Sequence, residues 1–136
     1  MVSALTWSHA SLVGVQAMDD QHGILMDTLN EMRVQLLRGA AREAVAAQME
    51  RLIEFTGMHF ACEESLLERH GYPGLEAHRK EHQRLMNEIR QALDRTQHGQ
   101  SGDLQPLLDF LRRWYMVHVE TLDYQYGAWL NARGIF

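Results

Sequence analysis

Residues 45–67, VAAQMERLIEFTGMHFACEESLL, decide the fold of this chain. Small and apolar residues recur here every three or four positions, which is the period of an amphipathic α-helix. The inward stripe consists of Val45, Met49, Leu52, Ile53, Thr56, His59, Phe60, Glu63 and Leu67. The stretch therefore predicts a helix that turns one histidine and one carboxylate, four residues apart, toward an apolar core.

Three other segments of the chain show the same helical period of apolar residues, and glycine-containing breaks separate the four segments. We expect helices over residues 19–38, 41–70, 75–97 and 103–132, with Asp19 and Asp103 as N-caps. The first helix is expected to bury Ile24, Leu25, Thr28, Leu29, Met32 and Leu36. Short connections favour antiparallel neighbours. The sequence thus predicts an all-α, up-down-up-down antiparallel four-helix bundle (residues 19–132) with an extended N-terminal arm (residues 1–18), together forming one domain over residues 1–136.

Composition narrows the class of protein. The chain has 136 residues, 46% of them hydrophobic, and a formal net charge of −5. An acidic chain is a poor match for nucleic acid, because phosphate binding needs a basic face. The single cysteine, Cys62, excludes an internal disulfide and favours a reducing compartment; we expect its side chain to be buried. We see neither a signal peptide nor an apolar run of membrane-spanning length, so we expect a cytoplasmic protein.

Histidines and carboxylates on the inward faces are the candidate functional residues. Residues four apart share a helix face, so His59 with Glu63, and His78 with His82, can each direct two side chains at one point. His22 lies on the stripe of the first helix. Any one of these residues is more often an ordinary hydrogen-bonded core or surface residue than a metal ligand. Together they are different, because burying so many polar groups without a partner would cost several kcal/mol each.

The spacing in the last helix does not identify which carboxylate lies beside its histidine. It carries His118, but Asp123 follows five residues later, about 140° around an ideal helix, and Glu120 fits no better. A local π-like distortion or a long reach would be needed to bring a carboxylate onto the face of His118.

The ligand types restrict the metal. Imidazole suits zinc, copper, iron and nickel, and a set of this size is too large for one tetrahedral zinc ion. Two octahedral ions that share bridging carboxylates account for it. A di-iron centre is therefore favoured over a di-manganese centre.

With these residues, the chain resembles the hemerythrin family in its single-domain bacterial form. The resemblance covers nearly the whole chain. It is carried by Trp7, Asp19-Asp20-Gln21-His22, His59-Phe60-x-x-Glu63-Glu64, Tyr72-Pro73, His78-x-x-x-His82 and Trp114-x-x-x-His118-x-x-x-x-Asp123. In that family the carboxylate of the last helix lies five residues after its histidine, which favours Asp123.

The resemblance implies roles for these residues. His78, His82 and His118 would hold one iron that is coordinatively filled. His22 and His59 would hold a second iron that keeps a position open for dioxygen. Glu63 and Asp123 would bridge the two irons beside an oxo or hydroxo group. The pocket wall at the matching positions would comprise Leu25, Phe60, Trp114, Tyr115 and Val119, although core packing is the simpler explanation for Leu25, Phe60 and Val119.

Tyr115 departs from the family, which usually has an aliphatic residue there. Its hydroxyl could hydrogen-bond a bound ligand, reach an iron, or point away to an ordinary buried partner.

Three functions follow from the resemblance. The first is a protein that binds dioxygen reversibly, for carrying, storage or delivery. The second is a di-iron peroxidase or oxidase. The third is a dioxygen or redox sensor acting through a separate, unknown protein partner. A histidine-rich site favours the dioxygen binder over an enzyme, because the ferritin-like di-iron oxygenases use mainly carboxylates.

Overall fold

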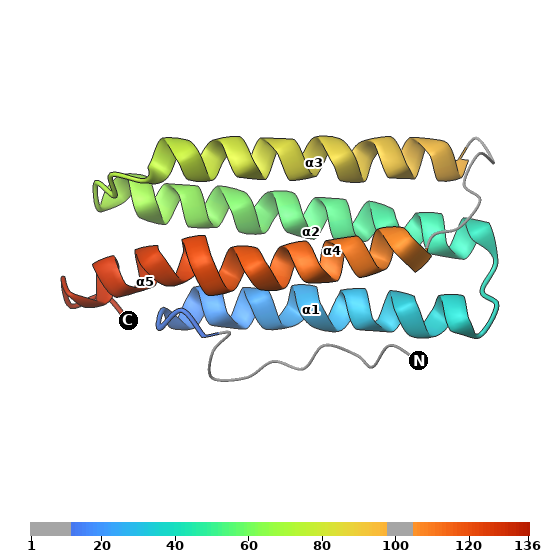
Figure 1. Ribbon diagram of the computed structural model, residues 1–136, viewed down its shortest axis with the longest axis horizontal. Coiled ribbons are helices and arrows are strands. Elements are labelled where there is room, and N and C mark those ends of the chain that lie inside the picture. The colour runs from blue at the N-terminus through green and yellow to red at the C-terminus, as the bar shows by residue number, and fades with distance from the viewer. Residues whose placement is uncertain (1–11, 98–104) are drawn as a thin grey trace.

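The computed structural model describes residues 12–97 and 105–136, and in these residues the chain is helical, without strands. The elements are α1 (Gln16–Leu37), α2 (Arg42–Arg69), α3 (Leu75–Gln97), α4 (Gln105–His118), the π-helical turn η2 (Val119–Asp123) and α5 (Tyr124–Asn131). The helices lie side by side along the long axis, and α4, η2 and α5 follow one another as a single rod (Figure 1). The predicted all-α four-helix bundle is confirmed.

The predicted start of the first helix is wrong. Helix α1 begins at Gln16 and its N-cap position is Val15, so Asp19 lies within the first turn. The Asp19 carboxylate accepts hydrogen bonds from the backbone N–H groups of Val13 (2.8 Å) and Gly14 (3.2 Å). Asp19 therefore ties the segment before the helix to the bundle.

The end of α1, both ends of α2, the start of α3 and the end of α5 agree with the prediction to within one residue. Gly39 and Gly71, which end the first two helices, have φ values of 77° and 69°. This left-handed conformation is strained for residues with a Cβ atom and stops a helix. The predicted N-cap Asp103, and residues 1–11 of the predicted arm, lie outside the described residues.

The predicted inward stripe of residues 45–67 is buried along its whole length. Two expectations about burial are wrong. Ile24 is 50% exposed and Cys62 is exposed. Each lies beside a buried residue, Leu25 or Glu63, and successive helix residues point about 100° apart. The buried stripe is too narrow to include them.

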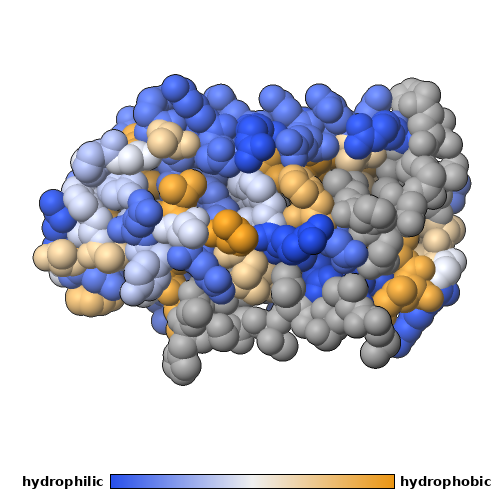
Figure 2. All heavy atoms as spheres, in the orientation of Figure 1, coloured by the Kyte–Doolittle hydropathy of each residue, from blue (hydrophilic) through white to orange (hydrophobic). Residues whose placement is uncertain are grey.

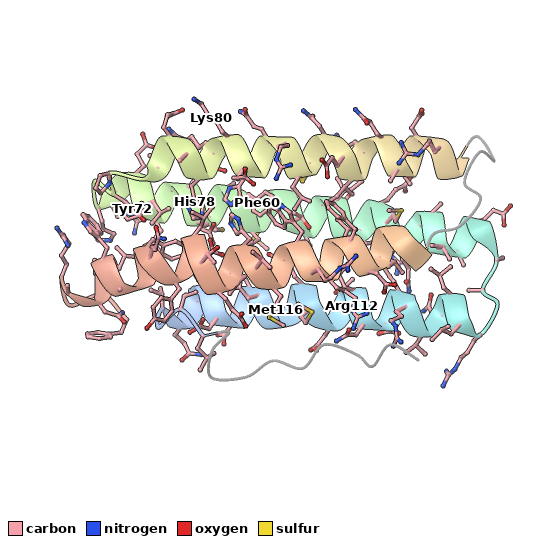
Figure 3. The ribbon with its side chains drawn as sticks, viewed as in Figure 1. Phe60, Tyr72, His78, Lys80, Arg112 and Met116 are labelled. Carbon is pink, nitrogen blue, oxygen red and sulfur yellow. The ribbon has the colours of Figure 1, made fainter. Side chains whose placement is uncertain are left out.

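The bundle interior has two parts. Figure 3 shows Phe60 and His78 pointing into the half of the bundle that ends at the α2–α3 turn, whereas Lys80 points outward. The other half buries mainly apolar side chains, among them Met32, Met49, Ile89 and Leu108, but it also encloses Arg112. Polar side chains cover the outer surface of α3 (Figure 2). None of the described helices combines the length and the apolar content needed to cross a membrane.

Candidate metal centre

All the predicted ligands lie close together in the half of the interior that ends at the α2–α3 turn. They come from α1, α2, α3 and the continuous segment formed by α4, η2 and α5. No member is more than 5% exposed: they are His22, His59, Glu63, His78, His82, His118 and Asp123. Side chains as far apart in sequence as His22 and Asp123 are thus gathered away from solvent.

The carboxylate of Glu63 lies between two groups of histidines. Its Oε1 atom is 3.1 Å from His78 Nε2 and 3.0 Å from His82 Nε2. Its Oε2 atom is 3.5 Å from His22 Nε2 and 3.4 Å from His59 Nε2. One oxygen therefore faces each group.

Asp123 repeats this division. Its Oδ1 atom lies 2.7 Å from His78 Nε2 and 3.0 Å from His118 Nε2. Its Oδ2 atom lies 3.1 Å from His22 Nε2. Both carboxylates thus present one oxygen to a three-histidine group and the other to the histidines of the opposite side.

The π turn brings Asp123 to this position. Residues Val119–Asp123 form η2, directly after His118. A π turn holds more residues than an α turn, so a residue five positions later returns to the same face. This is the distortion that the sequence spacing required.

The residues fit a pair of metal ions. Ligand atoms of Glu63, His78, His82 and His118 lie within 4.8 Å of one another, and so do those of His22, His59 and Glu63. Although His82 Nε2 and His118 Nε2 are each 3.0 Å from a carboxylate oxygen, neither makes a hydrogen bond, and Glu63 Oε1 accepts none. Buried polar atoms in this state cost free energy, and a cation at the centre of each group would satisfy them.

The outer ring nitrogens of two ligand histidines have fixed partners. His59 Nδ1 donates to Gln21 Oε1 at 2.6 Å, and His82 Nδ1 donates to Glu64 Oε2 at 2.8 Å. Arg79 Nε in turn donates to Glu64 at 3.3 Å. With the proton on Nδ1, each Nε2 presents its lone pair to the centre.

Gln21, Glu64 and Tyr126 were not identified as site residues from the sequence. The Tyr126 hydroxyl donates to Glu63 Oε2 at 2.8 Å. Gln21 and Glu64 each adjoin a predicted ligand in sequence, but they bond to a histidine of another helix. Periodicity within one helix carries no signal for such a contact.

Without metal, the site balances its own charge. Burial alone lowers the pKa of His22, but hydrogen bonds to Asp123 and Glu63 outweigh it and raise that pKa to about 9. The same opposing causes raise the pKa of His78 to about 10. Burial acts to raise the pKa of Glu63 and Asp123, but their histidine partners hold both below the usual range.

Aromatic rings flank the three-histidine group. Phe60 stacks on His82 with ring centroids 3.7 Å apart, and Trp114 stacks on His118 at 4.6 Å. The side chains of Leu25 and Val119 are fully buried. Phe60 and Trp114 therefore place apolar ring faces against two of the histidines.

Tyr115 lies near the other group. Its ring centroid is 6.0 Å from that of His22 and 6.5 Å from that of His59. Its hydroxyl is buried and has no hydrogen-bond partner in the described part of the chain. Burial first, and then the carboxylates of Glu63 and Asp123, raise the pKa of Tyr115 well above its usual value. The alternative of an ordinary buried partner therefore has no support among these residues.

Residues 13–130 match the family model described as the hemerythrin HHE cation-binding domain. The chain belongs to the hemerythrin family. A hemerythrin domain holds a di-iron centre with dioxygen as its ligand, and the two ligand groups described above suit that cofactor. As a hemerythrin, the chain is a non-haem iron, oxygen-binding protein.

Individual hemerythrins cover nearly the full chain. It is 29% identical to bacteriohemerythrin of Methylococcus capsulatus over 132 residues, which cover 96% of this chain and 100% of that one. It is 32% identical to bacteriohemerythrin of Pseudomonas aeruginosa over 123 residues, covering 90% and 78%. Two hemerythrin crystal structures superpose on this chain with a TM-score of 0.86, and each match covers 93% of this chain and 97% of the other. One is a wild-type hemerythrin that is 28% identical. The other is a variant with one leucine changed to tyrosine that is 29% identical.

Proposed function

We propose that this protein binds dioxygen reversibly, to carry, store or deliver it. The observation that carries this proposal is the unequal division of histidines about Glu63. Two histidines face its Oε1 atom and two face its Oε2 atom, while His118 adds a third imidazole to the first side only. The side with fewer protein ligands is the one that keeps a position open.

We assign His78, His82 and His118 to one iron, and His22 and His59 to the other. Glu63 and Asp123 would contribute to both irons, because each places one oxygen on each side. The iron pair would supply the electrons for dioxygen binding. The protein holds the imidazoles of His59 and His82 in the tautomer that ligates and buries the site away from bulk water.

The apolar lining supports reversibility, since water and protons promote irreversible oxidation of such a site. We assign Leu25, Phe60, Trp114, Tyr115 and Val119 to this lining. All of them except Trp114 are buried, and Trp114 is partly buried against the core.

We also propose a cytoplasmic setting, which suits a protein whose one cysteine is an exposed free thiol. A sensor role would require a separate protein partner.

The test is spectroscopic. Protein with two irons per chain by metal analysis is reduced without oxygen, exposed to dioxygen, and returned to vacuum. Visible absorption that appears with oxygen and disappears under vacuum is the expected result. Visible absorption that does not disappear under vacuum would contradict reversible binding and support a peroxidase instead. One zinc ion per chain would contradict the iron assignment itself.

A further inference from the structure

The site has an aromatic connection to the surface that dioxygen binding does not require. Tyr126 is fully buried, and its hydroxyl donates to Glu63 Oε2. The Tyr126 ring lies 6.4 Å from the ring of Tyr72, which lies 5.4 Å from that of Trp129. The guanidinium of Arg133 covers Trp129 at 3.5 Å.

This chain of rings leads outward. Tyr72 and Trp129 are both partly exposed. Figure 3 shows Tyr72 at the end of the bundle formed by the α2–α3 turn, beyond His78 along the same direction. Tyr126 is thus the buried end of a short row of oxidisable side chains, and Tyr72 and Trp129 are its surface end.

We propose that Tyr126, Tyr72 and Trp129 form a path that carries oxidising equivalents away from the metal site to the protein surface. The proposal rests on the iron site assigned above and goes beyond its binding of dioxygen. The oxidant is hydrogen peroxide, and the final reductant is a small donor such as ascorbate or a thiol, acting at Tyr72 or Trp129.

The Tyr126–Glu63 hydrogen bond is the step that makes the path selective. A phenol that loses an electron must also release its proton, so it needs an acceptor already in contact. Tyr126 has one at 2.8 Å. Tyr115 is also buried beside the site, with Trp114 at 5.9 Å, but its hydroxyl has no hydrogen-bond acceptor among the described residues. The Tyr115–Trp114 pair therefore lacks what oxidation of a buried tyrosine requires. Tyr72 needs no acceptor within the protein, because it is partly exposed and can release its proton to water.

The electrons and protons balance. Conversion of one hydrogen peroxide to two water molecules takes two electrons and two protons. In each of two passages Tyr126 gives up one electron while its proton moves along the hydrogen bond to Glu63. Tyr126 then regains an electron from Tyr72 or Trp129, and its proton returns from Glu63. The partly exposed donor ring releases its own proton to solvent and recovers one electron and one proton from ascorbate. Two ascorbate molecules each supply one electron and one proton, so the protein ends unchanged.

The test compares iron-loaded proteins of equal iron content and equal helical content. Each is mixed with hydrogen peroxide without added reductant and frozen, and organic radicals are measured by electron paramagnetic resonance. Oxidised residues are then located by peptide mass spectrometry. We expect a tyrosyl radical in the unchanged protein, with oxidation at Tyr72 and Trp129.

Tyr126→Phe should lose this radical and move oxidation to residues at the site, such as Phe60 and Trp114. Tyr124→Phe is the matched control, because Tyr124 lies on the same helix but is 55% exposed. It should leave both the radical and the oxidation pattern unchanged.

Trp129→Leu provides a second variant that leaves the Tyr126–Glu63 bond in place. It should keep the tyrosyl radical and prolong its lifetime. An unchanged radical yield and oxidation pattern in Tyr126→Phe would overturn the path, as would the absence of any organic radical in iron-loaded protein. Because neither readout depends on reversible oxygen binding, failure of the path is distinguishable from failure of the proposed function.

Discussion

At the scale of single residues, we expect the hydrogen bonds behind the proposed ligands to control how firmly metal is held. Glu64 accepts the Nδ1 proton of His82 and is itself bound by Arg79. Loss of such an outer partner typically weakens metal affinity about 10- to 100-fold. Glu64→Gln should therefore speed the loss of iron to a chelator to a similar extent, measured by the decay of visible absorption.

Glu68→Gln is the matched control for this prediction. Glu68 also contacts Arg79, at 3.2 Å, but its side chain is 68% exposed, and the structure shows no contact between it and a ligand histidine. Iron loss at the rate of the unchanged protein is expected. Equal acceleration in the two variants would mean that Arg79, rather than the His82 contact, governs retention.

Tyr115 tests what a hydroxyl does in the proposed pocket. Tyr115→Leu removes a buried hydroxyl without a partner among the described residues and restores the aliphatic residue usual in the family. We expect a changed rate of autoxidation and a shifted visible spectrum, followed after air exposure of reduced protein. If both stay unchanged, Tyr115 has no role toward the bound ligand.

Helical spacing predicted that the candidate ligands within α2 and within α3 lie side by side, because residues four apart share a helix face. The contacts of Gln21, Glu64 and Tyr126 were out of reach, since each joins two helices whose relative rotation the sequence does not state. Spacing also left the carboxylate of the last helix open. The spacing indicated that a π-like turn or a long side-chain reach was needed after His118. It could not decide between them, because the form of the turn depends on packing against the other helices.

At the scale of elements, the π turn lets residues before and after it both face the interior of the bundle, although their spacing does not fit one regular α-helix. His118 and Asp123 face the site, while Tyr126 and Leu130 of α5 remain in the core. Deletion of exposed Thr121 places His118 and Asp123 four residues apart, still on one face. We expect the variant to keep cooperative unfolding and its iron, with stability within about 1 kcal/mol of the original.

Deletion of Gln125, one turn further on, is the matched control. It leaves the π turn in place but rotates the helix beyond it by about 100°. Tyr126 and Leu130 would then leave the core, at a cost of roughly 3–5 kcal/mol for a lost large side chain. Urea unfolding followed by circular dichroism measures both variants. Equal destabilisation would show that the wide turn itself is indispensable.

At the scale of the whole molecule, the two ends of the described chain close the metal-binding half of the bundle. Val13 and Val15, just before α1, are buried. Asn131 Nδ2, at the end of α5, donates to Gly14 O at 3.0 Å. The first and last parts of the bundle are thus joined next to the helix that carries Tyr126.

Gly127 is the point of closest approach in this closure. A Cβ atom added at Gly127 would lie 1.9 Å from the carbonyl oxygen of Val13, which is backbone and cannot rotate away. Gly127→Ala should therefore displace the segment before α1 and lower the free energy of unfolding by about 1–3 kcal/mol. Gly23→Ala is the control within α1, because a Cβ there meets nothing within 4 Å. Since alanine favours a helix interior over glycine, it should raise stability by about 1 kcal/mol. Urea unfolding of the two variants should give opposite signs, and a Gly127→Ala protein as stable as the original would show that the closure contributes nothing.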